Sequence, residues 1–209
     1  FIRNHGVYQD LVNATFDASG RFHDLPDEEK MALKANEHNV GYMGPGWSVS
    51  RASQVYEGER KANLVAAFFL KRDLPPDHSD IVENKPFRGA KQWPADLEGF
   101  RETTVAYMNA MEALAKSMLP IYATALDLPA DFFAKAFEEP QYTLRLSHYP
   151  PAEAEDNQFG LALIPANSIK TKILFDLNDV HNFFVYIHVF VFYKHDVFQC
   201  EARSCLYFC

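Results

Sequence analysis

A long apolar stripe between Asp96 and Leu128 constrains the fold of this chain more than any other feature of its sequence. Large apolar residues recur there at helical spacing and cover about eight turns. Three glutamates and one lysine are scattered along its other face, which is typical of a helix with one face on a core and the other in solvent. Pro120 falls inside the stripe and is expected to kink or divide the helix. The stripe consists of Leu97, Phe100, Met108, Met111, Leu114, Met118, Leu119, Tyr122 and Leu126.

Shorter segments on both sides of the stripe predict further helices and two strands. Residues 7–22 have helical periodicity, and Pro26 followed by three acidic residues and a lysine is a helix-start signal for a short helix to about Ala35. The stretches 39–47 and 73–94 are rich in turn-forming residues and are expected to be loops. Strands are predicted at 64–70 and 141–149, and another short helix at 130–137.

Composition and charge exclude several classes of protein. The chain has 209 residues, of which 48% are hydrophobic and 23% charged, as in globular domains. A net charge of -8 argues against a nucleic-acid partner, because it leaves no basic surplus to neutralise phosphates. No apolar run reaches the roughly 18–20 residues of a membrane span, and no signal peptide is visible. All three cysteines lie between Cys200 and Cys209, which favours a reduced cytoplasmic protein. The start without Met suggests a truncated or trimmed N-terminus.

Five segments in a fixed order resemble one enzyme superfamily, the iron(II)/2-oxoglutarate dioxygenases related to isopenicillin N synthase. The resemblance implies an α+β fold in which an N-terminal helical layer covers a double-stranded β-helix, or jelly roll, that is incomplete in this chain. It divides the chain into an N-terminal region (1–140), the start of the oxygenase domain (141–162) and a divergent, aromatic-rich tail (163–209). The segments are Asn4-His5-Gly6, Phe22–Lys30, Gly41-Tyr42, Phe68-Phe69 and Arg145–Pro150.

The resemblance also implies where iron ligands should lie. The family holds iron(II) with two His and one carboxylate, and the first two ligands form a His-x-Asp pair. Counting from Gly160, that pair is expected near Ile164 and Ala166, within the sequence Leu-Ile-Pro-Ala-Asn-Ser at 163–168. The chain reaches Cys209 without the family's distal His or its later Arg-x-Ser. The prediction is therefore an inactive fragment of a small-molecule dioxygenase, with no catalytic or metal-binding residues. Fe(II) and 2-oxoglutarate are cofactors of the complete family but are not expected here.

Residues near the end of the 141–149 strand are the remaining site candidates. The resemblance places Ser147 and Tyr149 on the side of the co-substrate, and the Tyr149 hydroxyl is suited to reach a carboxylate. His148 should point to the opposite face and serve a structural role. Arg145-Leu146-Ser147 spells Arg-x-Ser but precedes the expected iron pair, so it is not interpreted as the family's carboxylate-binding motif. His78-Ser79-Asp80 is the one His-x-Asp of the chain and is expected to be a solvated loop.

Three hypotheses remain open for the function. The first is a truncated or mis-translated dioxygenase whose reading frame changes near Ala162. The second is a non-catalytic binding or regulatory module derived from the family. An incomplete barrel would leave apolar surface uncovered, so self-association is expected. The third is an enzyme that uses a new metal site in the tail, although the cysteines there lack the tight Cys-x-x-Cys spacing of zinc sites. Its candidate ligands are His181, His188, His195, Cys200, Cys205 and Cys209.

Overall fold

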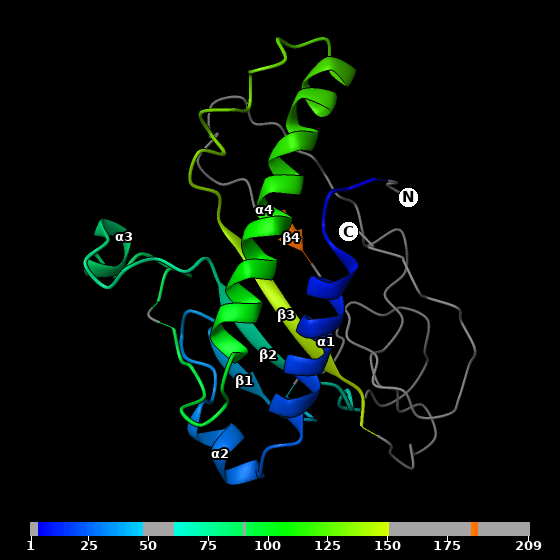
Figure 1. Cartoon of the computed structure of the whole chain (residues 1–209). Coiled ribbons are helices and arrows are strands. Elements are labelled where there is room, and N and C mark those ends of the chain that lie inside the picture. Colours follow the sequence, from blue (N-terminus) through cyan, green and yellow to red (C-terminus); the bar gives the residue numbers. More distant parts are fainter. Residues whose placement is uncertain (1–3, 48–60, 90, 151–184, 188–209) are drawn as a thin grey trace.

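The computed structural model describes residues 4–47, 61–89 and 91–150, together with the backbone of a strand at 185–187 (Figure 1). The helices and strands confirm the predicted α+β class. No helix in these described ranges is both long and apolar enough to cross a bilayer. In chain order the elements are α1 (Gln9–His23), α2 (Asp27–Ala32), β1 (Gly41–Met43), β2 (Ala66–Lys71), α3 (Ser79–Val82), α4 (Phe100–Ala125), β3 (Tyr142–His148) and β4 (Val185–Ile187).

The four strands form one sheet in the order β1-β2-β3-β4. β2 pairs antiparallel with both β1 and β3, whereas β4 runs parallel to β3. In the β2–β3 pair, Phe68 lies opposite Leu146 and Phe69 lies opposite Arg145. Because successive side chains of a strand point to opposite faces, this register places Phe68 and Leu146 on one face and Phe69 and Arg145 on the other.

Helices α1 and α4 lie side by side over the first of these faces (Figure 1). The core between the layers is centred on Phe22, which is fully buried. Its ring centroid lies 4.3 Å from that of Phe68 and 5.6 Å from that of Phe100, so one side chain of α1 joins β2 to α4. The buried cluster comprises Val7, Ala18, Phe22, Tyr42, Ala66, Phe68, Leu70, Phe100, Tyr107, Met108, Met111, Leu114, Tyr142, Leu144 and Leu146.

Two segments that were predicted to be loops contain short elements. β1 lies within 39–47, where it hydrogen-bonds the chain before it: the Tyr42 amide donates to the Leu33 carbonyl at 2.7 Å. α3 lies within 73–94 and begins at the His78 cap. α2 ends at Ala32, before the predicted Ala35. β4 belongs to the predicted tail, and the other residues of 163–209 lie outside the described part of the chain.

The structure corrects two predictions about the second half of the chain. Of the two effects expected of Pro120, division of the long helix does not occur, because α4 runs unbroken from Phe100 to Ala125. The predicted helix at 130–137 is a series of turns, in which the amides of Phe132 and Ala134 donate to carbonyls only three residues earlier, both at 2.9 Å. Its apolar side chains still pack: Phe133 and Phe137 form a second cluster with Ala123.

A network of ion pairs ties α4 to the sheet. The Arg72 guanidinium, just after β2, lies 3.3 Å from the Glu112 carboxylate of α4 and 3.5 Å from Glu139. Lys116 is paired with Glu112 at 2.8 Å. Only 12% of the Glu112 side chain is exposed, so its interactions are poorly screened by solvent.

Replacing Glu112 by glutamine is expected to lower the free energy of unfolding by about 1–3 kcal/mol. The glutamine amide has nearly the shape of the carboxylate, but it lacks the negative charge with which both Arg72 and Lys116 are paired. Urea denaturation followed by circular dichroism measures the change. Glu83→Gln is the matched control, because Glu83 is exposed and pairs with the exposed Lys85. Equal midpoints for the two variants would contradict a structural role for the network.

Candidate functional site

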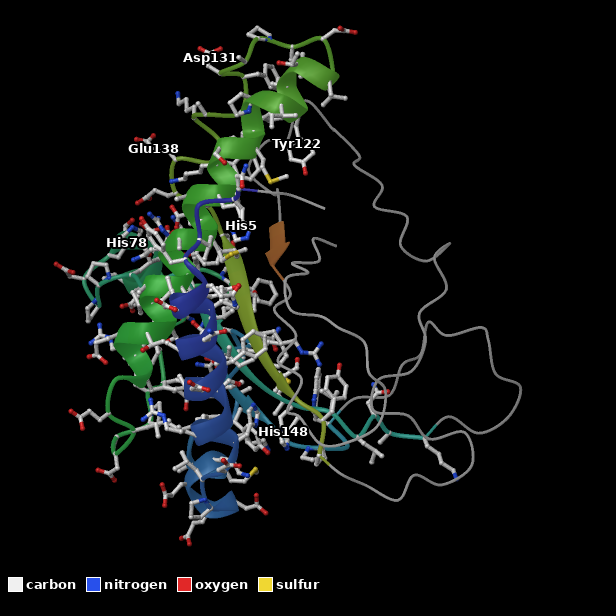
Figure 2. The ribbon with its side chains drawn as sticks, turned by 45° about the vertical axis from the view of Figure 1, so that its right-hand side comes forward. His5, His78, Tyr122, Asp131, Glu138 and His148 are labelled. Carbon is white, nitrogen blue, oxygen red and sulfur yellow. The ribbon has the colours of Figure 1, made fainter. Side chains whose placement is uncertain are left out.

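The face of the sheet that turns away from the helices carries the candidate site. Leu144 and Leu146 of β3 belong to the helix-covered core, so the alternate residues Thr143, Arg145 and Ser147 face the other way. Figure 2 shows α1 and α4 together on one side of β3. The same alternation in β2 adds Ala67, Phe69 and Lys71 to this face.

Arg145 is the central side chain of this face. It is only 8% exposed, although its guanidinium carries a charge. Its Cζ lies 5.5 Å from the ring centroid of Phe69 and 5.9 Å from that of Trp47, distances typical of cation–π contacts. Its Nε and Nη2 atoms are buried without a hydrogen-bond partner in the described part of the chain. Burial lowers the pKa of Arg145, and the nearby Tyr149 opposes that shift.

Ser147, the first of the two predicted co-substrate residues, lies near the end of β3, and the second, Tyr149, directly follows the strand. Ser147 is fully buried, and its Oγ has no hydrogen-bond partner among the described residues. It lies opposite Ala67 of β2. Tyr149 lies just beyond the end of β3 and is half-buried. Burial raises the pKa of Tyr149, and the nearby Arg145 opposes part of that shift.

Lys71 gives the same face a second cation. Its Nζ donates a hydrogen bond to Thr143 Oγ1 and lies 5.6 Å from the ring centroid of Phe87. The side chain is buried, and this burial lowers the pKa of Lys71 to about 8. Lys71 and Arg145 are diagonal neighbours in the β2–β3 register, so the face between them favours an anion.

His148 packs on the opposite side, as predicted. Its ring stacks on that of His23 in α1, with centroids 5.0 Å apart and an angle of 18° between the planes. Figure 2 places it beside the C-terminal end of α1. His23 Nε2 is 3.2 Å from the Leu146 carbonyl and donates to it. Burial, followed by the proximity of His148, lowers the pKa of His23 to about 3. These contacts give His148 a packing role.

The described residues do not fit an iron centre, because no group of three His, Cys, Asp or Glu side chains among them is arranged to hold a metal ion. The single His-x-Asp is used structurally: His78 Nδ1 accepts from the Asp80 amide at 3.2 Å, and the Asp80 carboxylate pairs with Lys85 at 2.6 Å. Ile164 and Ala166, the expected ligand positions, lie outside the described residues, as do the histidines and cysteines of the tail.

The positions of Arg145 and Lys71 on the site face were not predicted from the sequence. One local signal was available, because in β3 the polar residues Thr143, Arg145 and Ser147 alternate with apolar ones. The aromatic side chains that flank Arg145 come from other segments and gave no local signal.

Comparison with protein families identifies the class of this fold. Residues 1–96 match the family described as the N-terminal region of a non-haem dioxygenase in morphine synthesis. The match covers α1, α2, β1, β2 and α3. The part of the fold that these residues form is therefore similar to the N-terminal region of non-haem dioxygenases.

Similar proteins narrow this class to one superfamily. The 2-oxoglutarate-Fe(II) type oxidoreductase hxnY of Emericella nidulans is 31% identical over 75% of this chain and 45% of its own length. A 2-oxoglutarate-Fe(II) type oxidoreductase of Aspergillus fumigatus is 33% identical over 77% of this chain and 47% of its own. This chain therefore spans less than half the length of these relatives.

Solved structures agree with this assignment. A 2OG-Fe(II) oxygenase family protein of Caulobacter crescentus has 27% identity and a TM-score of 0.57, over 70% of this chain and 45% of its own. A Neurospora crassa protein in complex with alpha-KG shares the fold at 23% identity and a TM-score of 0.53, over 69% of this chain and 42% of its own. The N-terminal region of this chain belongs to the 2-oxoglutarate/Fe(II) dioxygenase superfamily, as its sequence motifs predicted.

Proposed function

We propose that this chain is a piece of a 2-oxoglutarate/Fe(II)-dependent oxidoreductase of small-molecule metabolism, and that its sequence does not form an iron centre at the family's ligand positions. The observation that carries the second part is the chemistry of Ile164 and Ala166. Both side chains are hydrocarbon and have no atom that coordinates iron. On this proposal 1–140 is the N-terminal region, 141–162 opens the oxygenase domain and 163–209 is a divergent tail.

The proposal assigns Ser147 and Tyr149 to the co-substrate side of the domain. The assignment is supported by the orientation of β3, which presents Ser147 on the sheet face away from the helices. The oxidoreductases of Emericella and Aspergillus are named for 2-oxoglutarate and Fe(II), and the Neurospora structure contains alpha-KG. We also propose a small-molecule substrate and a cytoplasmic location for this chain. The cytoplasmic location is supported by the cysteines, which are confined to 200–209.

Anaerobic titration with iron(II) and 2-oxoglutarate tests the proposal. The ternary complex of an intact family member has a weak visible charge-transfer band, and this band is expected to be absent here. The Emericella nidulans relative, titrated in the same buffer, serves as the positive control. A band that saturates at one equivalent of iron would overturn the proposed loss of the iron centre.

A further inference from the structure

The core-facing side of α4 continues beyond the sheet that the helix covers, as Figure 1 shows. Between Phe100 and Leu114 this side is buried in the core. Residues four apart lie on the same side of a helix, so the row continues through Met118, Tyr122 and Leu126. Past Leu114 the cover ends: Met118 is half-buried, and Tyr122 and Leu126 are 49% and 45% exposed. The apolar side that builds the core thus reaches solvent at the end of the helix.

Ile121 widens this exposed surface, because it follows Met118 by three positions and is 67% exposed. We call the four residues Met118, Ile121, Tyr122 and Leu126 the α4 ridge, and Figure 2 places Tyr122 on the projecting end of the helix. Eight large apolar side chains are exposed in the described part of the chain, and three of them belong to this ridge. Single exposed apolar residues are common on protein surfaces, whereas a contiguous group indicates an interaction surface.

The α4 ridge is free of charge, although the chain has a net charge of -8. Between positions 113 and 126 the only charged residue is Lys116. It lies two positions before Met118 and therefore points to another side of the helix. There it pairs with Glu112 and donates to the Glu138 carbonyl at 2.9 Å. A charged partner such as a nucleic acid finds no complementary group on the ridge, and a second copy of this acidic chain is not repelled there.

The spacing of the ridge suits a second copy of the same helix. Met118, Tyr122 and Leu126 form a row of residues four apart. In the commonest class of helix packing, rows of this kind from two helices interdigitate, and the axes cross at about 50°. Two copies present the same row to each other, so a twofold contact meets this requirement without a different partner. Tyr122 is the middle residue of the row, which places the twofold axis beside it.

We propose that the α4 ridge joins two copies of this chain in a symmetric dimer, with the two Tyr122 side chains at the centre of the contact. Tyrosine is enriched at the centres of protein interfaces, and the uncharged residues around it are typical of an interface core. The inference assigns the expected self-association to one surface. It goes beyond the proposed function, because the ridge uses no residue of the candidate site.

Sedimentation equilibrium of the whole chain tests the dimer, and the expected mass is that of two chains, falling towards one on dilution. Tyr122→Glu and Tyr122→Lys each set two like charges against each other at the axis. Each variant alone is expected to weaken dimerisation by about 100-fold or more. Mixed in equal amounts, the two variants bring opposite charges together, and the dimer is expected to return. Such a rescue requires that the same position of both copies meets in the contact.

Val82→Lys is the matched control, because Val82 is an exposed apolar residue of α3, outside the ridge. This variant is expected to keep the dimer mass. Circular dichroism checks that each Tyr122 variant keeps its helices, as expected for an exposed position.

Three outcomes would overturn the inference. If the unmodified chain is a monomer at every concentration, the ridge is covered by the chain itself or by a different protein. If Tyr122→Glu stays dimeric, another surface joins the copies. If both variants are monomeric and their mixture is too, the contact is not symmetric about Tyr122. None of these results depends on iron, so they are independent of the titration that tests the proposed function.

Discussion

Replacing Phe22 by alanine is expected to lower the free energy of unfolding by about 3–5 kcal/mol. The side chain is fully buried where both main helices meet the sheet. Its ring contacts Phe68 of β2, Phe100 of α4 and Tyr42 of β1, at centroid distances of 4.3, 5.6 and 5.9 Å. The neighbouring side chains cannot readily move into the cavity that the alanine leaves, because each of them is itself an aromatic ring held in place by its own contacts. Domains are stable by only about 5–15 kcal/mol, so this one change removes a large share of the total.

Urea denaturation followed by circular dichroism measures the loss. Phe132→Ala is the matched control, because it deletes the same atoms from a side chain that is 40% exposed. It is expected to cost about 1 kcal/mol or less. If the two variants unfold at the same urea concentration, Phe22 is not the centre of the core. A loss of cooperativity in Phe22→Ala alone would still agree with the structure.

The sequence predicted those parts of the fold that local periodicity determines. The apolar stripe of α4 is long, and the helix continues through Pro120. Contacts along the rest of the helix compensate for the backbone hydrogen bond that proline cannot donate. β1 was missed because three residues carry no periodicity, and its pairing comes from distant segments. The helix at 130–137 was predicted because Phe133 and Phe137 have helical spacing. In the structure, successive turns and not a helix bring both side chains to the same cluster.

The candidate site was predicted less completely, because its defining property is tertiary. Resemblance to the family selected Ser147 and Tyr149, and strand alternation places Ser147 on the sheet face away from the helices. Arg145 was set aside on its position in the sequence. Its importance follows from burial, from the rings of Phe69 and Trp47, and from the absence of a described acceptor. None of these three properties can be inferred from the residues next to Arg145 in the sequence.

Acidification below pH 6.5 is expected to destabilise the protein through His23. Its ring is buried between α1 and β3, donates to the Leu146 carbonyl and stacks on His148. These surroundings lower the pKa of His23 to about 3, whereas an unfolded histidine has a pKa of about 6.5. Between these values the unfolded chain binds a proton that the folded chain excludes. The stability from this group is complete above pH 6.5 and is lost as the pH falls towards 3, by about 1.4 kcal/mol per pH unit.

Urea denaturation at pH 7.0, 6.0 and 5.0 measures this slope, and the loss should approach about 2 kcal/mol by pH 5.0. His148, whose pKa is also lowered by burial, acts in the same direction. His23→Gln keeps a donor for the Leu146 carbonyl but cannot titrate, so its stability should vary less over this range. The same slope in His23→Gln would assign the acid sensitivity to other groups, because a neutral amide at this position takes up no proton on unfolding.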